Sequence, residues 1–252
     1  MAIGFARLGA RLALIARSKA ELDLAHIEIE QTGGNALRIR GDVADAEQMT
    51  VAIDRVRVAY GGVPDVLICA AGVAGPLHDF LHCSLKQWTD ALQINLMGVV
   101  NACRAVLPGM VERRHGKIII LTCGSGLAPK LHFSSYATAK TAVVRFVESI
   151  APELAEHNVQ INCLDPGPAY TSITDEIIRA GDRIDPKTAA EAIEVRRTGG
   201  TSPEEQMKLA EFLASENSNH ITGRLIHIED DWKKLKNSTP RADAFTLRRV
   251  GR

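Results

Sequence analysis

The chain of 252 residues has few aromatic side chains and no net charge. Tryptophan, tyrosine and phenylalanine together make up 4% of it, and 30 basic side chains balance 30 acidic ones. A neutral composition gives no reason to expect nucleic acid or an anionic membrane as a partner. No apolar run has the length that spans a bilayer, and the start lacks the pattern of a secretory signal. We therefore expect a cytoplasmic protein.

Cysteine pairs are also missing. The five cysteines are odd in number and form no C-x-x-C motif, and they lie at Cys69, Cys83, Cys103, Cys123 and Cys163. Scattered cysteines of this kind, several of them in or beside strand-like runs, favour reduced and mostly buried thiols over disulfides or a metal site. We expect no bound metal.

Short apolar runs alternate with longer helical patterns along the chain. The runs are residues 12–16, 36–39, 66–70, 117–122, 159–164 and 224–228. Such runs, separated by helices of ten or more residues, are typical of a parallel sheet covered on both faces. The sequence predicts an α/β protein with a doubly wound, Rossmann-like sheet in three layers. We place one domain over residues 1–230.

For two segments the sequence allows two alternative roles. Residues 170–200 are polar and partly helical, and they form either a lid over a substrate site or a plain surface excursion. Residues 231–252 form a basic tail, which is either solvated or docked on its own domain or on a sister subunit.

Tyr136 and Lys140 are the pair of residues that most clearly indicates a catalytic role. They are four apart on a predicted helix that begins after Ser134 and Ser135, so they share a face. A nearby ammonium favours the phenolate form of tyrosine, so we expect Lys140 to lower the pKa of Tyr136 and to make it an acid/base group. A surface tyrosine–lysine pair is the alternative.

The surroundings of this pair carry a family resemblance. Upstream lie the stretches 69–72 and 122–126 and a helical Asn95, and downstream lies Asp165-Pro166-Gly167-Pro168, followed by Thr171. In this order and spacing they resemble the short-chain dehydrogenase/reductase family, from Ile3 to about Ile228.

The resemblance implies catalytic roles. Tyr136 would be the general acid/base on the substrate oxygen, and Lys140 would lower its pKa and bind the nicotinamide ribose. Asn95 would position a water in the proton relay; its alternative is local hydrogen bonding inside the helix.

The resemblance also implies cofactor contacts. Pro166, Gly167 and Thr171 match the segment over the nicotinamide, and the remaining contacts would come from Asp42 and Val43 beside the adenine and from Ala71 and Gly72 after a strand. The usual acidic residue that binds the ribose of NAD is replaced by Ala16, and Arg17-Ser18 follows. A guanidinium without a carboxylate suits a 2′-phosphate, so we expect NADP rather than NAD. The alternative is that Arg17 is only a solvated residue that follows the strand.

The family's first strand and its T-G-x-x-x-G-x-G turn are missing from this chain. The glycines of that turn let backbone N–H groups approach the pyrophosphate. The strand lies mid-sheet in the family, so we expect unpaired edges on the strands at 12–16 and 66–70 unless a neighbour moves across. Either the given start is too late or the protein works without this strand.

The position of the family's catalytic serine is occupied by Cys123, whose thiol is a weaker donor than a hydroxyl. Thr122 and Ser125 lie close enough to supply the hydroxyl instead, and Cys123 could be only a small apolar filler.

These features predict an NADP(H)-dependent oxidoreductase that interconverts a carbonyl and a secondary alcohol of a small molecule by hydride transfer. We expect a homodimer or homotetramer formed through the helices of Asn95 and Tyr136, with small or apolar contacts at Ala102, Ala105, Ala139, Ala142 and Val143. The alternative is a degenerate or truncated family member that keeps the fold and this surface without binding a cofactor.

Overall fold

The structure is a computed structural model that describes residues 1–248, except for the side chain of Ser125. The strands are β1 Leu12–Ala16, β2 Ala36–Arg40, β3 Val66–Cys69, β4 Gly116–Leu121, β5 Val159–Asp165 and β6 Leu225–His227. The helices are α1 Ala2–Arg7, α2 Lys19–Glu30, α3 Ala46–Tyr60, α4 Leu85–Leu92, α5 Gly98–Glu112, α6 Ser134–Ala155, α7 Ser172–Ala180, α8 Pro186–Thr198 and α9 Pro203–Ala214. Each apolar run singled out in the sequence contains a strand, which confirms the α/β prediction.

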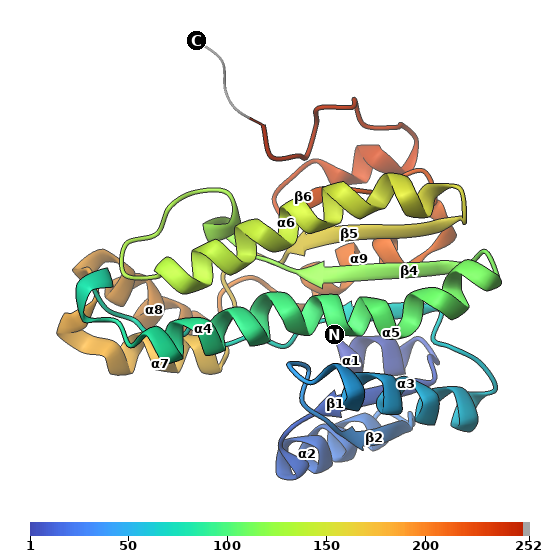
Figure 1. Cartoon of the computed structure of the whole chain (residues 1–252), viewed down its shortest axis with the longest axis horizontal. Coiled ribbons are helices and arrows are strands. Elements are labelled where there is room, and N and C mark those ends of the chain that lie inside the picture. Colours follow the sequence, from blue (N-terminus) through green and yellow to red (C-terminus); the bar gives the residue numbers. More distant parts are fainter. Residues whose placement is uncertain (249–252) are drawn as a thin grey trace.

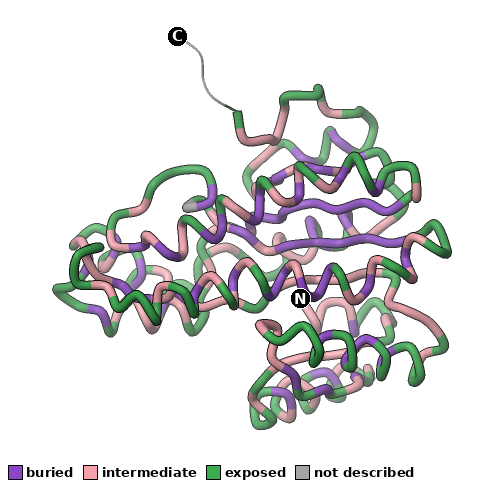
Figure 2. The backbone as a smooth tube through the Cα atoms, in the orientation of Figure 1, coloured by how far each residue is buried: buried purple, intermediate pink, exposed green. Residues whose placement is uncertain are grey.

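The strands form two parallel sheets. One has the order β3-β4-β5-β6 and the other consists of β1 and β2 (Figure 1). Helices α5 and α6 pack their apolar sides on one face of the larger sheet, and α9 packs on the other. The predicted three-layer arrangement is therefore present, and the core lies on both sides of β4 and β5 (Figure 2).

The inner edges of the two sheets are unpaired. Among the described residues, β1 pairs only with β2 and β3 pairs only with β4, which confirms the prediction that these edges lack a neighbour. All residues of β1 and β3 are only partly buried, so water reaches them. Met1, which caps α1, and Phe5 pack against the same apolar cluster as Val66 and Ile68 of β3, so α1 bridges the two parts of the molecule without supplying a strand.

A long apolar helical run leads from α4 through a π-helical turn at Gln93–Met97 into α5. By length and composition alone, Leu85–Glu112 could cross a membrane, contrary to our reading of the sequence. Within the fold this run is a core helix, because Cys103, Val106 and Met110 are completely buried against the sheet.

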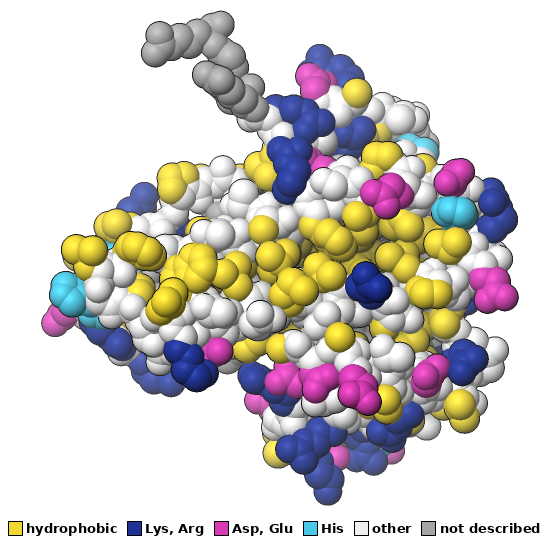
Figure 3. Space-filling model, in the orientation of Figure 1, with side chains coloured by type: hydrophobic (Ala, Val, Ile, Leu, Met, Phe, Trp, Pro, Cys, Tyr) yellow, Lys and Arg dark blue, Asp and Glu magenta, His cyan; other side chains and the backbone are white. Residues whose placement is uncertain are grey.

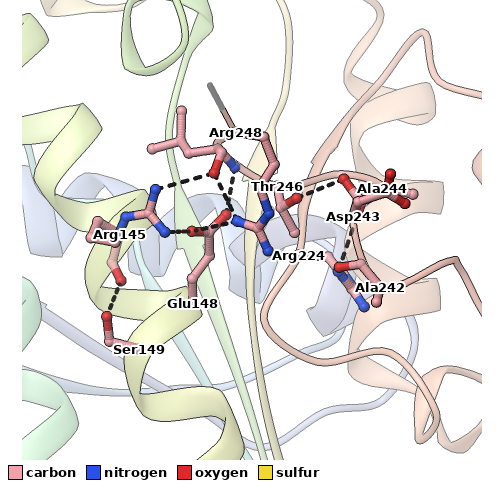
Figure 4. Close-up of polar contacts among 10 residues, drawn as sticks. Arg145, Glu148, Ser149, Arg224, Ala242, Asp243, Ala244, Thr246 and Arg248 are labelled. Carbon is pink, nitrogen blue, oxygen red and sulfur yellow. Dashed lines mark hydrogen bonds and ion pairs between the residues drawn. The ribbon is translucent and has the colours of Figure 1, made fainter. Parts of the chain in front are cut away.

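The basic tail docks on its own domain as far as residue 248. Trp232 is buried and stacks on Phe212 of α9, with ring centres 5.5 Å apart. Farther along, the backbone oxygen of Phe245 accepts a hydrogen bond from Leu225 at the outer edge of β6, at 2.8 Å. Glu148 of α6 accepts a hydrogen bond from the backbone of Leu247 (Figure 4). Of the two alternatives for the tail, the structure therefore has the docked one.

We expect a core substitution in β5 to cost more stability than one in β1. Ile161 is fully buried, whereas Ile15 is partly exposed beside the unpaired edge. Ile161→Ala should lower the free energy of unfolding by about 3 kcal/mol, because it removes packed methyl groups and leaves a cavity. Ile15→Ala should cost roughly half as much by the same reasoning. Urea denaturation of both variants tests this, and equal losses would contradict the difference in burial.

Candidate active site

The candidate site lies at the carboxyl ends of β3, β4 and β5, beside the first turns of α6. Gly72 follows β3 and lies at the centre of the candidate catalytic residues. A carbon added to Gly72 would lie 2.8 Å from Oδ1 of Asn95 and 4.0 Å from Nζ of Lys140. Helix α6 begins at Ser134, so Tyr136 and Lys140 fall in its first two turns. The fold therefore brings together the three catalytic residues that the resemblance implies.

Lys140 and Tyr136 lie side by side in a buried setting. Nζ of Lys140 is 5.6 Å from the centre of the Tyr136 ring and donates a hydrogen bond to the backbone oxygen of Leu121, at 2.8 Å. Only 6% of Lys140 is exposed. Burial lowers the pKa of Lys140, and nearby groups, Cys123 first among them, partly offset this.

The pKa of Tyr136 moves in the direction opposite to our prediction. Burial raises the pKa of Tyr136, and its contact with Cys123 and the charges of Asp165 and Glu176 raise it further. Lys140 lies against the ring and is hydrogen-bonded to a backbone oxygen, so it does not outweigh these effects. Tyr136 is accordingly a neutral, proton-carrying phenol near neutral pH.

Asn95 clamps two segments of backbone. It is fully buried in the π-helical turn, and its Nδ2 donates to the backbone oxygens of Ala91 and Val73, each at 2.9 Å. Its Oδ1 accepts from the backbone nitrogen of Val73, at 3.2 Å. Of these three bonds, the one to Ala91 lies inside the helix and the two to Val73 fix the loop after β3, and the relay role of Asn95 stays a prediction.

The three candidates for the missing serine differ in placement. Cys123 is in hydrogen-bonding contact with Tyr136. Thr122 is buried, and its Oγ1 has no hydrogen-bond partner among the described residues. The side chain of Ser125 lies outside the described part of the chain. Of the two candidates whose side chains are described, Cys123 is the one in contact with the tyrosine.

Three further side chains belong to this site and were not among the predicted catalytic residues. Ser135 is fully buried, and its Oγ lies 2.6 Å from where a carbon on Gly75 would be; in the described structure this Oγ has no partner. Asp165 is almost fully buried, and burial raises its pKa. Glu176 of α7 accepts a hydrogen bond from the backbone of Ala74 at 3.2 Å. The sequence offered a signal for Asp165 in its D-P-G turn, but none for Glu176.

The segment 170–200 packs around the site. Helix α7 and the turn after it pack with Phe133 at the start of α6 and with Leu77 of the loop after β3, and Tyr136 lies against the same cluster. This arrangement agrees with the lid alternative. Thr171 stands at the N-cap of α7, where its backbone nitrogen donates a hydrogen bond to Oγ1 of Thr174, at 3.2 Å. Gly167 has a φ of 69° and lies against Thr201, which makes the Pro166-Gly167 turn a tight one.

The predicted adenosine contacts lie at the carboxyl ends of β1 and β2. The side chain of Arg17 is largely exposed, and its guanidinium lies 3.9 Å from the carboxylate of Asp42. Ser18 caps α2 by accepting a hydrogen bond from Glu21, at 3.2 Å. Val43 packs on Gly98 at the start of α5. Ala71, at the end of β3, is exposed beside Gly72.

These residues fit the two ends of a nicotinamide dinucleotide. The buried Tyr136–Lys140 pair suits the reacting end, and nearby Oγ1 of Thr122 and Oδ2 of Asp165 have no hydrogen-bond partner among the described residues. An accessible guanidinium suits a ribose phosphate at the other end. Among residues 1–248, however, no strand lies between the inner edges of β1 and β3. A glycine turn that would follow such a strand and hold the pyrophosphate is therefore not found in this part of the chain.

Comparison with known proteins agrees with the geometry. Residues 1–181 match the family model described as short chain dehydrogenase. The chain is 33% identical to Oxidoreductase UcpA of Salmonella typhimurium, over 87% of this chain and 83% of that protein.

Solved structures show the same fold. An actinorhodin polyketide ketoreductase with NADPH has a TM-score of 0.80 and 24% identity, over 90% of this chain and 88% of that one. An NAD⁺-bound xylitol dehydrogenase has the same TM-score and identity, over 90% and 91%. With the family model covering well over half of the sequence, the chain belongs to the short-chain dehydrogenase/reductase family and is an oxidoreductase of that class.

Proposed function

We propose that this protein is an NADP(H)-dependent oxidoreductase that interconverts a carbonyl and a secondary alcohol of a small molecule. The observation that carries the proposal is the meeting of Tyr136, Lys140 and Asn95 around Gly72. A nicotinamide cofactor, when bound, supplies or accepts the hydride, and the protein contributes position and a proton.

Tyr136 is suited to carbonyl reduction because it carries its proton at neutral pH. As hydride adds to the carbonyl carbon, the O–H bond of Tyr136 breaks and its proton passes to the carbonyl oxygen. The remaining phenolate is stabilised by Lys140 in its protonated form and is then reprotonated from solvent. The thiol of Cys123 beside the phenol can donate only a weak hydrogen bond to the same oxygen.

Arg17 supports the choice of NADP. It stands at the end of β1, with no acidic residue at the preceding position, and its side chain is 60% exposed. A guanidinium there would bind a 2′-phosphate by a charge-assisted hydrogen bond. The fold itself does not choose the cofactor, because its solved neighbours include one with NADPH and one with NAD⁺.

A homodimer or homotetramer is part of this proposal. Hydrophobic side chains gather over α4, α5 and α6 on one side of the molecule (Figure 3). Those of α5 and α6 are partly exposed at Ala105, Leu107, Val111, Phe146 and Ile150. The predicted interface needs correction, since Ala102, Ala139 and Val143 are buried in the core of their own chain. We place the protein in the cytoplasm, where its five cysteines would stay reduced.

A second candidate function is that of a family member that keeps its fold and association surface and binds no nicotinamide cofactor. The observation in its favour is that, within residues 1–248, no strand or glycine turn lies between the inner edges of β1 and β3. Thermal unfolding separates the two. A ligand present at a hundredfold over its dissociation constant stabilises a protein by about 2.7 kcal/mol, so NADPH should raise the melting temperature of the enzyme and leave that of the degenerate protein unchanged.

Tyr136→Phe should reduce carbonyl reduction by roughly 10²–10⁴-fold, because the variant keeps the ring and loses the proton donor. Tyr170→Phe is the matched control, since Tyr170 is half exposed and its hydroxyl bonds only Asp175 in the described structure. The measurement is NADPH oxidation with a panel of ketones under saturating cofactor. A Tyr136→Phe variant as active as the control would refute the acid/base role.

Arg17→Glu should weaken NADPH binding by roughly 10–100-fold, because it replaces a charged hydrogen bond to the phosphate by repulsion. NADH binding should change little. Arg57→Glu makes the same charge change on the exposed side of α3 and serves as control. Fluorescence titration with both cofactors measures the effect, and an equal loss for NADPH and NADH would contradict phosphate recognition by Arg17.

Cys123→Ser should increase the rate of carbonyl reduction by about tenfold, because a hydroxyl donates a stronger hydrogen bond than a thiol to the developing oxyanion. Cys83→Ser is the control, since Cys83 lies in the loop before α4 and its thiol bonds only the backbone oxygen of His78 among the described residues. Steady-state kinetics should show the gain in kcat. An unchanged or lower kcat in Cys123→Ser would mean that this position only fills space.

A further inference from the structure

Two histidines share one carboxylate in the loop between β3 and α4. Nδ1 of His78 lies 2.7 Å from Oδ2 of Asp79, and Nδ1 of His82 lies 2.7 and 2.8 Å from its two oxygens. The three candidate ligand atoms all lie within 4.8 Å of one another. None of these residues takes part in the site described above.

The backbone holds these side chains on one side of the loop. Asp79 immediately precedes the 3-10 turn Phe80–His82, and the backbone nitrogen of His82 bonds to the oxygen of Asp79 at 3.2 Å. Just before it, Leu77 is buried against the start of α6 and the turn after α7. The cluster therefore stands on an anchored base, although His82 itself is largely exposed.

The chemistry of the cluster suits a metal ion of intermediate softness. Two imidazole nitrogens and a carboxylate oxygen are ligands that Zn²⁺ accepts, and Ni²⁺ and Cu²⁺ bind similar sets. Such bonds are about 2.0–2.2 Å long, so a bound ion would hold the ligand atoms somewhat farther apart than hydrogen bonds do. The exposed His82 side chain has room for this movement, with 71% of its surface accessible.

We propose that His78, Asp79 and His82 bind a divalent cation of the Zn²⁺ class through both Nδ1 atoms and one carboxylate oxygen. Water completes the coordination. Each imidazole binds the ion through Nδ1 in its neutral form, with its remaining proton on Nε2, and binding weakens as the solution becomes acidic because protons compete with the ion for the ring nitrogens. The bound ion ties both ends of the turn to one point and restrains the loop beside α7.

The test is calorimetric titration of the full chain with ZnCl₂ at pH 7.5, followed by Co²⁺ absorption spectroscopy. We expect one strong site in the unmodified protein, with a tetrahedral visible spectrum for Co²⁺. His78→Ala and His82→Ala should each weaken Zn²⁺ binding by more than the roughly 10–100-fold that loss of an outer-sphere partner costs. Because both variants alter a surface loop, circular dichroism should show an unchanged fold.

His115→Ala is the matched control, because His115 is also exposed beside a carboxylate, that of Asp65 at 4.0 Å, but has no second histidine there. It should bind Zn²⁺ as tightly as the unmodified chain. The proposal is overturned if the unmodified chain has no strong site. It is equally overturned if the His78→Ala and His82→Ala variants bind as well as the control, since the metal would then be held elsewhere.

Discussion

The parallel pairing of β4 with β5 is the interaction on which the site depends. All residues of β5 and nearly all of β4 are buried, and the register pairs Leu121 with Leu164 at the carboxyl ends. This pairing places Cys123 and Asp165, which follow or end these strands, at one edge of the sheet. Helix α6 then packs across the sheet and delivers Tyr136 to that same edge.

The unpaired edges of β1 and β3 set a different constraint. Exposed edge groups can bond water, which avoids the roughly 1–3 kcal/mol that each buried unsatisfied group would cost. The smaller sheet is instead joined to the larger part by helix packing. Val43 fits against Gly98, and Asn101 donates to the backbone oxygen of Val43 at 2.9 Å. Helix α5 thus holds the end of β2 in place relative to the larger sheet, between the two ends of the proposed cofactor site.

The sequence was sufficient to predict features that depend on spacing along the chain. The apolar runs predicted the strands, and the four-residue spacing predicted that Tyr136 and Lys140 share a face. It could not predict quantities set by the surroundings of a side chain. The pKa of Tyr136 depends on burial and on Glu176, which lies on a helix far away in the sequence. The cluster of His78 with His82 depends on the direction of a loop. The docking of the tail likewise depends on contacts with α6 and β6.

The raised pKa of Tyr136 and the burial of Lys140 belong to one electrostatic arrangement. A phenolate in this buried place, near the negative charges of Asp165 and Glu176, would be unstable without a cation. Lys140 is the basic side chain that the described structure brings to the tyrosine, and the oxygen of Leu121 fixes its amine there. In the proposed reaction the proton stays on Tyr136 at rest, and Lys140 would stabilise the phenolate once that proton has left. We therefore expect the site to act as an acid, which is the form that reduction of a carbonyl requires.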